Sequence, residues 1–129
     1  MITKYEFRPD SSGAGMNRGG SGLVRSYKCL MDGTTFTVTA DRERHRPWGM
    51  NGGRHGEGTR VYLRREGRTS RIPVKFTFEM KTGDEVEIRT AGGGGYGDPS
   101  DRRKSSIRQN IESGLLTRGR AKRDYGLSS

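Results

Sequence analysis

The chain has one cysteine among its 129 residues, and it has no long apolar run. A single thiol, Cys29, excludes an internal disulfide and any metal site built from several cysteines of this chain. No stretch approaches the roughly 20 apolar residues that a membrane-spanning helix needs, and the N-terminal MITKYEFRPD lacks the apolar stretch of a secretion signal. We therefore expect a soluble, cytoplasmic protein.

Residues that build hydrophobic cores are also scarce. Leu, Ile, Val and Phe together number 20, and the net charge is +10, a composition typical of disordered chains. The local pattern contradicts this, because Val74, Phe76, Phe78 and Met80 alternate with polar residues as in a strand with one buried face. We infer that the chain forms strands with a thin core, and that it completes this core against a larger subunit.

The strand pattern predicts hairpins. Strands over residues 23–31 and 34–40 flank Asp32-Gly33, a strong hairpin signal. Strands over 59–65 and 72–80 flank the turn sequence EGRTS. The fold predicted is mainly β, with hairpins forming a small sandwich or barrel-like sheet.

The turn at Lys81–Asp84 leads from the strand ending at Met80 into a further strand, EVEIRT. In the hairpin that we predict from Val74 to Ile88, Val86 and Ile88 point inward, whereas Glu85 and Glu87 point to solvent. Two carboxylates on a solvent face do not form an acid/base pair.

A two-helix segment is predicted after Asp98-Pro99. Ile107, Ile111 and Leu115 recur at helical spacing, and Gly114 is a natural stop. Thr117 is placed to cap a second short helix that ends before Gly126. We expect one domain over residues 1–129, with a β-rich part over 1–99 that contains the long loops 11–22 and 41–58, and a helical part over 100–129.

The sequence TAGGGGYGDP, residues 90–99, carries four consecutive glycines. A P-loop requires Lys-Ser/Thr after its last glycine, and none follows here; Asp98-Pro99 also interrupts the dinucleotide-binding pattern. The favoured interpretation is that the glycines allow backbone to pack against backbone or to adopt positive φ, before a helix starts at Asp98-Pro99. In a remaining alternative, their free amides face a site built mostly by another chain.

No other residues form a self-sufficient active site. His45 and His55 lack the spacing of a metal site, and Cys29 lies in an apolar strand where a buried, inert thiol is expected. We assign no catalytic residue and no metal ligand to the chain, and we expect it to bind no cofactor alone.

The positive charge comes from 19 Arg and only 6 Lys, concentrated in residues 41–72 and 101–129. Nucleic-acid binding is one interpretation. The sequence shows no RNA-recognition, zinc-finger or helix-turn-helix pattern, however. The preference for Arg suits a protein interface, where guanidinium groups pair with carboxylates.

Several short motifs follow one another along nearly the whole chain: Gly13-Ala14-Gly15, Arg18-Gly19-Gly20, Gly22-Leu23-Val24-Arg25, Asp41-Arg42, Pro47-Trp48-Gly49, Gly52-Gly53, Lys81 to Asp84 with Val86 and Ile88, Gly92 to Pro99, and Arg123-Asp124-Tyr125-Gly126. In this order and spacing they resemble the C-terminal part of hydantoinase B/oxoprolinase proteins. Ala91, in place of a proline, and Arg120, in place of an acidic residue, depart from the family pattern.

Members of that family are several times longer, so the resemblance implies a separate small subunit in an obligate hetero-oligomer. Its partners would be a larger hydantoinase B-like subunit and a hydantoinase A-like subunit, which would hold ATP and a divalent metal. The acetophenone carboxylase type resembles this case best, because its complex includes an unusually small subunit.

The resemblance therefore implies an accessory role in biotin-independent, ATP-dependent carboxylation of an aromatic ketone through phosphorylated intermediates. ATP-dependent hydantoinase or 5-oxoprolinase activity is the first alternative, and a basic nucleic-acid-binding module is the second. Residues expected in shared-site or interface loops are Arg18, Gly19, Gly20, Arg42, Trp48, Gly92, Gly93, Gly94, Gly95, Tyr96, Gly97 and Asp98.

Overall fold

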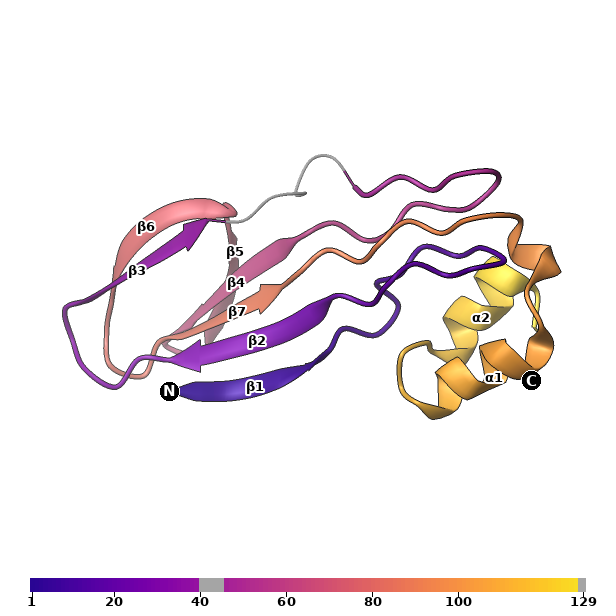
Figure 1. The fold of residues 1–129 in the computed structure, drawn as a ribbon. Coiled ribbons are helices and arrows are strands. Elements are labelled where there is room, and N and C mark those ends of the chain that lie inside the picture. Colours follow the sequence, from indigo (N-terminus) through magenta and orange to yellow (C-terminus); the bar gives the residue numbers. More distant parts are fainter. Residues whose placement is uncertain (40–45, 128–129) are drawn as a thin grey trace.

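A computed structural model describes residues 1–39 and 46–127, which form seven strands, one 3-10 helix and two α-helices (Figure 1). The elements are β1 (Ile2–Phe7), β2 (Leu23–Lys28), β3 (Thr34–Thr39), β4 (Arg60–Arg65), β5 (Arg68–Ile72), β6 (Lys75–Met80), β7 (Glu85–Arg89), η1 (Pro99–Asp101), α1 (Lys104–Glu112) and α2 (Arg118–Tyr125). The prediction of a mainly β fold with a two-helix C-terminal segment is confirmed.

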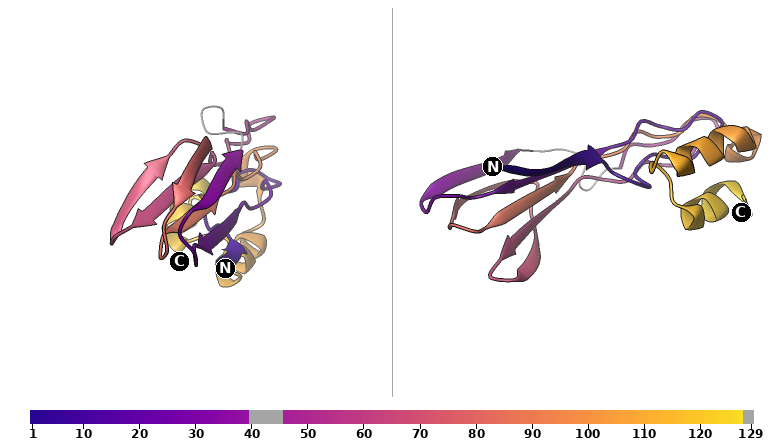
Figure 2. Two further views of the ribbon diagram at one scale, coloured as in Figure 1. Left: turned by 90° about the vertical axis from the view of Figure 1, so that its left-hand side faces the viewer. Right: turned by 90° about the horizontal axis from the view of Figure 1, so that it is seen from below.

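The strands form two antiparallel sheets, one ordered β1-β2-β7-β4-β5 and one made of β3 and β6. Val38 and Met80 of the small sheet share one apolar cluster with Val61 and Val86 of the large sheet. The β part is therefore a small sandwich, with the helices at the opposite end of the molecule from β3 and β6 (Figure 2).

The predicted pairing of residues 23–31 with 34–40 is wrong. Strand β2 pairs with β1 and β7, whereas β3 pairs with β6 in the other sheet. Asp32 accepts a hydrogen bond from the Thr82 amide at 2.6 Å, and the Gly33 amide donates to Met80 O at 3.2 Å. The Asp-Gly turn thus carries the chain from one sheet to the other, because its polar groups bind the neighbouring turn.

The hairpin predicted from Val74 to Ile88 is wrong for the same reason. Strands β6 and β7 lie in different sheets, and Asp84 fixes the corner between them by accepting from the Lys81 amide at 2.9 Å and from Arg65 Nη2 at 2.7 Å. The expected single strand 72–80 is divided between β5 and β6.

Strand β4 does form a hairpin with β5, but the turn is shorter than expected. Glu66 and Gly67 both have positive φ, 52° and 75°, so two residues are enough to reverse the chain. Residues 68–70 of the expected turn are therefore strand. Strand β1 was not predicted, and most of its side chains are exposed.

Between the sheets and the helices, three loop segments run side by side with almost no regular secondary structure (Figures 1 and 2). We call these residues, 11–20, 47–57 and 92–97, the glycine bundle. Gly93 exchanges hydrogen bonds with the first segment, accepting from the Gly13 amide and donating to Gly20 O, each at 2.8 Å. Gly95 donates to Arg54 O in the second segment at 2.9 Å. The glycine run is therefore the central chain of the bundle.

The glycine bundle leaves no room for side chains at its centre. A Cβ atom built on Gly92, Gly94 or Gly95 would overlap a backbone carbonyl oxygen, that of Ser11, Trp48 or Ala14 respectively. The interpretation that these glycines pack backbone against backbone is confirmed. Gly97 adds the predicted positive φ, at 81°.

The helical segment follows its predicted signals. Thr117 Oγ1 accepts from the Arg120 amide at the start of α2, and Gly126 ends this helix with a φ of 66°. Asp10 accepts hydrogen bonds from the Thr117 amide at 2.7 Å and from its hydroxyl at 2.8 Å, which attaches α2 to the start of the glycine bundle. Leu116, rather than Leu115, joins Ile107 in the buried helical cluster. Within the described ranges, neither helix is long and apolar enough to cross a membrane.

We predict that Gly94→Ala destabilises the fold by about 3 kcal/mol or more, because the new methyl group must displace backbone. Gly20→Ala is the matched control, since a Cβ on Gly20 meets nothing within 4 Å. Thermal unfolding followed by circular dichroism measures both. Equal melting temperatures for the two variants would contradict the backbone packing of the bundle.

Candidate functional site

The structure brings most of the predicted loop residues together. Gly19, Trp48 and Gly94 belong to three different segments of the glycine bundle, and a Cβ on Gly19 would overlap Gly93 O. Trp48 is 63% exposed, and its carbonyl oxygen lies against Gly94. Arg42 lies outside the described residues. The loops therefore meet, although mainly through backbone.

Most amides of the glycine run are not free to face a ligand. Five of them donate hydrogen bonds within the chain. These five amides are therefore not available to a ligand, which argues against the alternative that they line a partner's site. The bonds are Gly92 N to Glu57 O at 3.0 Å, Gly93 N to Gly20 O at 2.8 Å, and, each at 2.9 Å, Gly95 N to Arg54 O, Tyr96 N to Asn17 O and Gly97 N to Met50 O.

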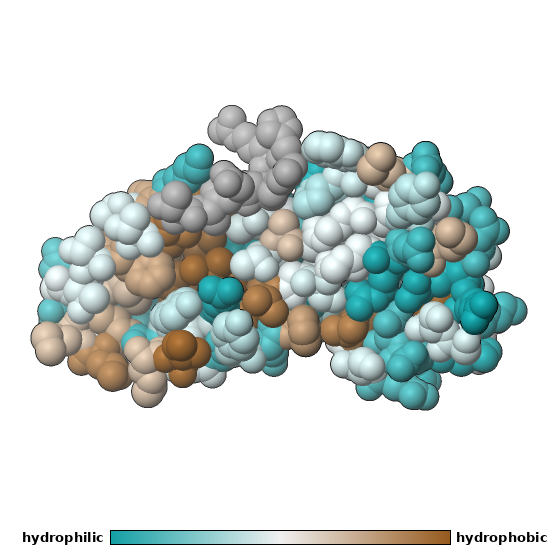
Figure 3. Space-filling model, viewed as in Figure 1, coloured by the Kyte–Doolittle hydropathy of each residue, from teal (hydrophilic) through white to brown (hydrophobic). Residues whose placement is uncertain are grey.

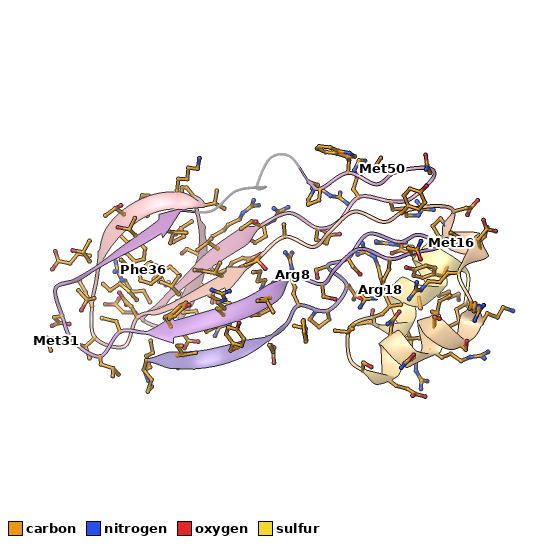
Figure 4. All side chains as sticks on the ribbon, viewed as in Figure 1. Arg8, Met16, Arg18, Met31, Phe36 and Met50 are labelled. Carbon is orange, nitrogen blue, oxygen red and sulfur yellow. The ribbon has the colours of Figure 1, made fainter. Side chains whose placement is uncertain are left out.

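Of the three charged residues predicted for the loops, the two that the structure describes, Arg18 and Asp98, have local roles. Arg18 Nη1 donates to Ser12 Oγ and Ser21 Oγ, both at 3.1 Å, on the side of the bundle near the helices (Figure 4). Burial lowers the pKa of Arg18, and the nearby charge of Arg102 lowers it further. Asp98 caps the 3-10 helix by accepting from the Ser100 amide at 2.9 Å, as predicted for a helix start.

Beside the bundle lies an open cavity of about 600 Å³ that no sequence pattern indicated. We call it the arginine cavity. Among the residues that the structure describes, its lining combines four arginines with one carboxylate, so this lining is strongly positive. Its lining residues are Arg46, Gly52, Gly53, Arg54, His55, Arg120, Arg123 and Asp124.

Arg120 holds the arginine cavity together. Only 17% of its side chain is exposed, and it donates from Nη2 to Glu57 Oε1 at 3.0 Å and from Nε to Asp124 Oδ2 at 2.7 Å. Burial lowers the pKa of Arg120, but the bonds to Asp124 and Glu57 more than compensate and raise it. The arginine that departs from the family pattern therefore ties helix α2 to the loop around Glu57.

Glu57 remains ionised behind the cavity. Burial raises the pKa of its carboxyl, but the hydrogen bond from Arg120 and the charges of Arg46 and Arg8 outweigh burial and lower it. Arg46 also lies near, with Nη2 4.0 Å from Glu57 Oε1. One carboxylate thus orients two guanidinium groups at the cavity wall.

The prediction that Glu87 faces solvent is wrong. Its side chain is 2% exposed, although it lies on the sheet face opposite β3 and β6. Long cationic side chains from neighbouring strands cover it, and the Arg89 guanidinium stacks 4.6 Å from the Tyr62 ring centre. Hydrogen-bond donors to Glu87 are Arg89 Nε at 2.8 Å, and Arg64 Nη2 and Ser26 Oγ, each at 3.4 Å. Arg89 Nη2 at 2.8 Å and Lys4 Nζ at 3.6 Å add ion pairs.

This arrangement keeps Glu87 charged. Burial raises the pKa of its carboxyl, but the hydrogen bond from Arg89 and the charges of Arg89, Lys4 and Arg64 outweigh burial and lower it. A carboxylate saturated with donors is a poor proton acceptor at neutral pH. Among the residues that the structure describes, no group of three or more His, Cys, Asp or Glu side chains is placed to hold a metal ion.

Comparison with known proteins decides the family. The sequence model described as Hydantoinase B/oxoprolinase matches residues 1–99, which include both sheets and the whole glycine bundle. This chain belongs to the hydantoinase B/oxoprolinase family. The match in sequence thus agrees with the motifs, most of which lie within the same residues.

Relatives in sequence extend the likeness into the helical segment. An uncharacterised Methanocaldococcus jannaschii protein, MJ0963, is 40% identical over 97% of this chain and 22% of its own length. A putative D-/L-hydantoinase subunit from a Pseudomonas species is 30% identical over 98% of this chain and 22% of its own length. 5-Oxoprolinase 1 of Arabidopsis thaliana is 31% identical over 75% of this chain and 8% of its own length.

Two solved structures share the fold. A nucleotide-free acetone carboxylase matches 99% of this chain with a TM-score of 0.84 and 19% identity. The ATP-dependent caprolactamase from Pseudomonas jessenii matches 99% with a TM-score of 0.82 and 23% identity. This member of the hydantoinase B/oxoprolinase family spans 21% and 23% of those two chains, so it corresponds to a minor part of them.

We predict that Glu87→Gln destabilises the protein by about 2 kcal/mol at pH 7, because several cations lose their shared carboxylate. The folded-state pKa of Glu87 is lowered. Its stabilisation is therefore complete above the unfolded pKa and lost as pH falls through the folded one. Urea unfolding at several pH values should show the difference from the unmodified protein shrinking below about pH 4.

Glu85→Gln is the matched control for this measurement. Glu85 lies on the same face of β7, but 24% of its side chain is exposed, and it shares its ion-pair partner Arg64 with Glu87. The control should lose well under 1 kcal/mol, as surface ion pairs do. Equal losses in both variants, or a pH-independent loss in Glu87→Gln, would refute the role given to Glu87.

Proposed function

We propose that this chain is the small, non-catalytic subunit of a cytoplasmic, ATP-dependent enzyme complex. Its partners are a larger hydantoinase B-like subunit and a hydantoinase A-like, ATP-binding subunit. The proposal rests on one observation: the chain matches nearly end to end with about a fifth of the length of MJ0963, of the D-/L-hydantoinase protein and of the acetone carboxylase chain. A chain that corresponds to a fraction of a larger enzyme needs the remainder to act.

The surface of the chain supports a large partner. Large apolar side chains gather at the end of the molecule that carries the N-terminus and the crossing from β2 to β3 (Figure 3). We call this surface the apolar end; it includes Met1, Ile2, Leu30 and Met31, which are 61–72% exposed. Beside them opens an apolar recess of about 300 Å³ lined in part by Met31 and Phe36 (Figure 4). A partner subunit that covers this surface would bury apolar area and so add the hydrophobic stabilisation that the thin core lacks.

For the reaction, we propose biotin-independent carboxylation of an aromatic ketone, as the likeness to the acetophenone carboxylase type implies. The large subunits would form the phosphorylated intermediates. This chain would contribute the docked sheets, the glycine bundle and the loops at residues 18–20 and 92–98. The shared fold with acetone carboxylase is compatible with this role.

ATP-dependent hydrolysis of a cyclic amide is the second candidate. It is favoured by the names of the sequence relatives, since the D-/L-hydantoinase protein and 5-oxoprolinase 1 are 30% and 31% identical to this chain. The role proposed for the small chain is the same for both reactions.

We predict that the untagged chain co-purifies with tagged large subunits when all are expressed together. Placing aspartate at Leu30 and Met31 should abolish recovery, because these side chains are 64% and 72% exposed and carry the apolar end. Lys122→Asp on exposed helix α2 is the control and should be recovered normally. A monomeric chain that ignores the large subunits and retains polynucleotide with a steep salt dependence would support the nucleic-acid alternative instead.

The assembled complex distinguishes the two reactions. ATP consumption should rise at least tenfold on adding acetophenone with bicarbonate, with formation of the carboxylated ketone. Stimulation by 5-oxoproline or hydantoin without bicarbonate would establish the amide hydrolysis in its place. Omitting the small chain should remove activity in either case.

A further inference from the structure

We propose that the arginine cavity binds a doubly charged phosphate-type oxyanion. The site lies outside the loops predicted from the sequence and does not depend on the function proposed above. Within residues 1–39 and 46–127, four guanidinium groups line it, and the carboxylates of Asp124 and the adjoining Glu57 balance two of them. Two positive charges remain within one cavity, which matches the charge of a phosphate group.

Two of the guanidinium groups that line the arginine cavity, those of Arg46 and Arg120, are held in position. Arg120 is held between Glu57 and Asp124, and Arg46 donates from Nε to Gly56 O at 3.0 Å while its Nη2 faces Glu57. These anchors belong to the glycine bundle and helix α2, so the guanidinium groups are oriented before a ligand arrives. Binding an anion there therefore costs little side-chain ordering.

The remaining two arginines are exposed at the rim. Arg123 is 67% exposed and pairs with Asp124 at 3.3 Å, while Arg54 is exposed shortly after the turn at Asn51-Gly52. Planar guanidinium groups donate two parallel hydrogen bonds to an oxyanion. Arg54 and Arg123 are thus placed to bind one side of a ligand whose other side contacts Arg46 and Arg120.

A small anion fits this cavity better than a macromolecule does. The volume of about 600 Å³ is in the range of small-molecule sites, and the described part of the wall contains no large apolar side chain for a peptide to bury. The shared chemistry is a tetrahedral dianion, which could be inorganic phosphate or the phosphoryl group of a larger molecule.

The test is titration of the full chain, in its complex if it is purified that way, with inorganic phosphate. Phosphorus-31 NMR and calorimetry at constant ionic strength report binding without requiring catalytic activity. The double variant Arg54→Gln/Arg123→Gln should weaken phosphate binding at least tenfold. Both side chains are exposed, so the fold should persist. Arg68→Gln, an exposed change on β5, is the matched control and should bind like the unmodified protein.

Three ligands separate the outcomes. Saturable binding of phosphate or of phenyl phosphate supports the site. Tighter binding of phosphate identifies free phosphate as the ligand, and tighter binding of phenyl phosphate identifies the phosphoryl group of a larger molecule. Acetate binding as tightly as phosphate would overturn the assignment of a dianion. No saturable binding of either phosphate ligand, or undiminished binding in the double variant, would overturn the site itself. None of these results depends on whether the complex carboxylates or hydrolyses its substrate.

Discussion

The close contact of backbone with backbone in the glycine bundle is the constraint on which the rest of the structure depends. Gly92, Gly94 and Gly95 each lie where a methyl group would overlap a carbonyl oxygen of a neighbouring segment. Hydrogen bonds between the three segments replace the side-chain packing that a core normally supplies. Because the bundle joins the sheets to the helices, the positions of both depend on glycines (Figure 1).

Ion pairs are a second source of stabilisation of the fold. Glu87 gathers cations from β1, β4 and β7 on one face of the large sheet, and Arg120 joins Glu57 in the bundle to Asp124 in α2. The buried Glu87 and the partly buried Arg120 are each paired with more than one group of opposite charge. A chain with few apolar residues thus fixes part of its tertiary contacts through polar side chains.

Local signals in the sequence were sufficient where a feature depends on a few neighbouring residues. Thr117 and Gly126 bound α2, Asp98-Pro99 starts the 3-10 helix, and the four glycines indicate close backbone packing. The strand pairing predicted around Asp32-Gly33 failed, because this dipeptide has the same sequence whether the next strand pairs with the preceding one or enters another sheet. The burial of Glu87 and the arginine cavity were missed because both combine residues far apart in the chain, whose approach depends on the tertiary fold.

The geometry of the bundle also limits which groups can meet a ligand. Its glycine amides are largely used within the chain, and its centre has no side chains, so the glycine motif itself has little to offer a bound molecule. What the bundle does supply is a rigid support for the side chains at its border. Arg54 in the bundle and Arg46 directly before it line one cavity together with Arg120 and Arg123 of α2. Recognition by this chain therefore falls to the arginines that flank the glycine motif, and the glycines contribute by fixing the distance between them.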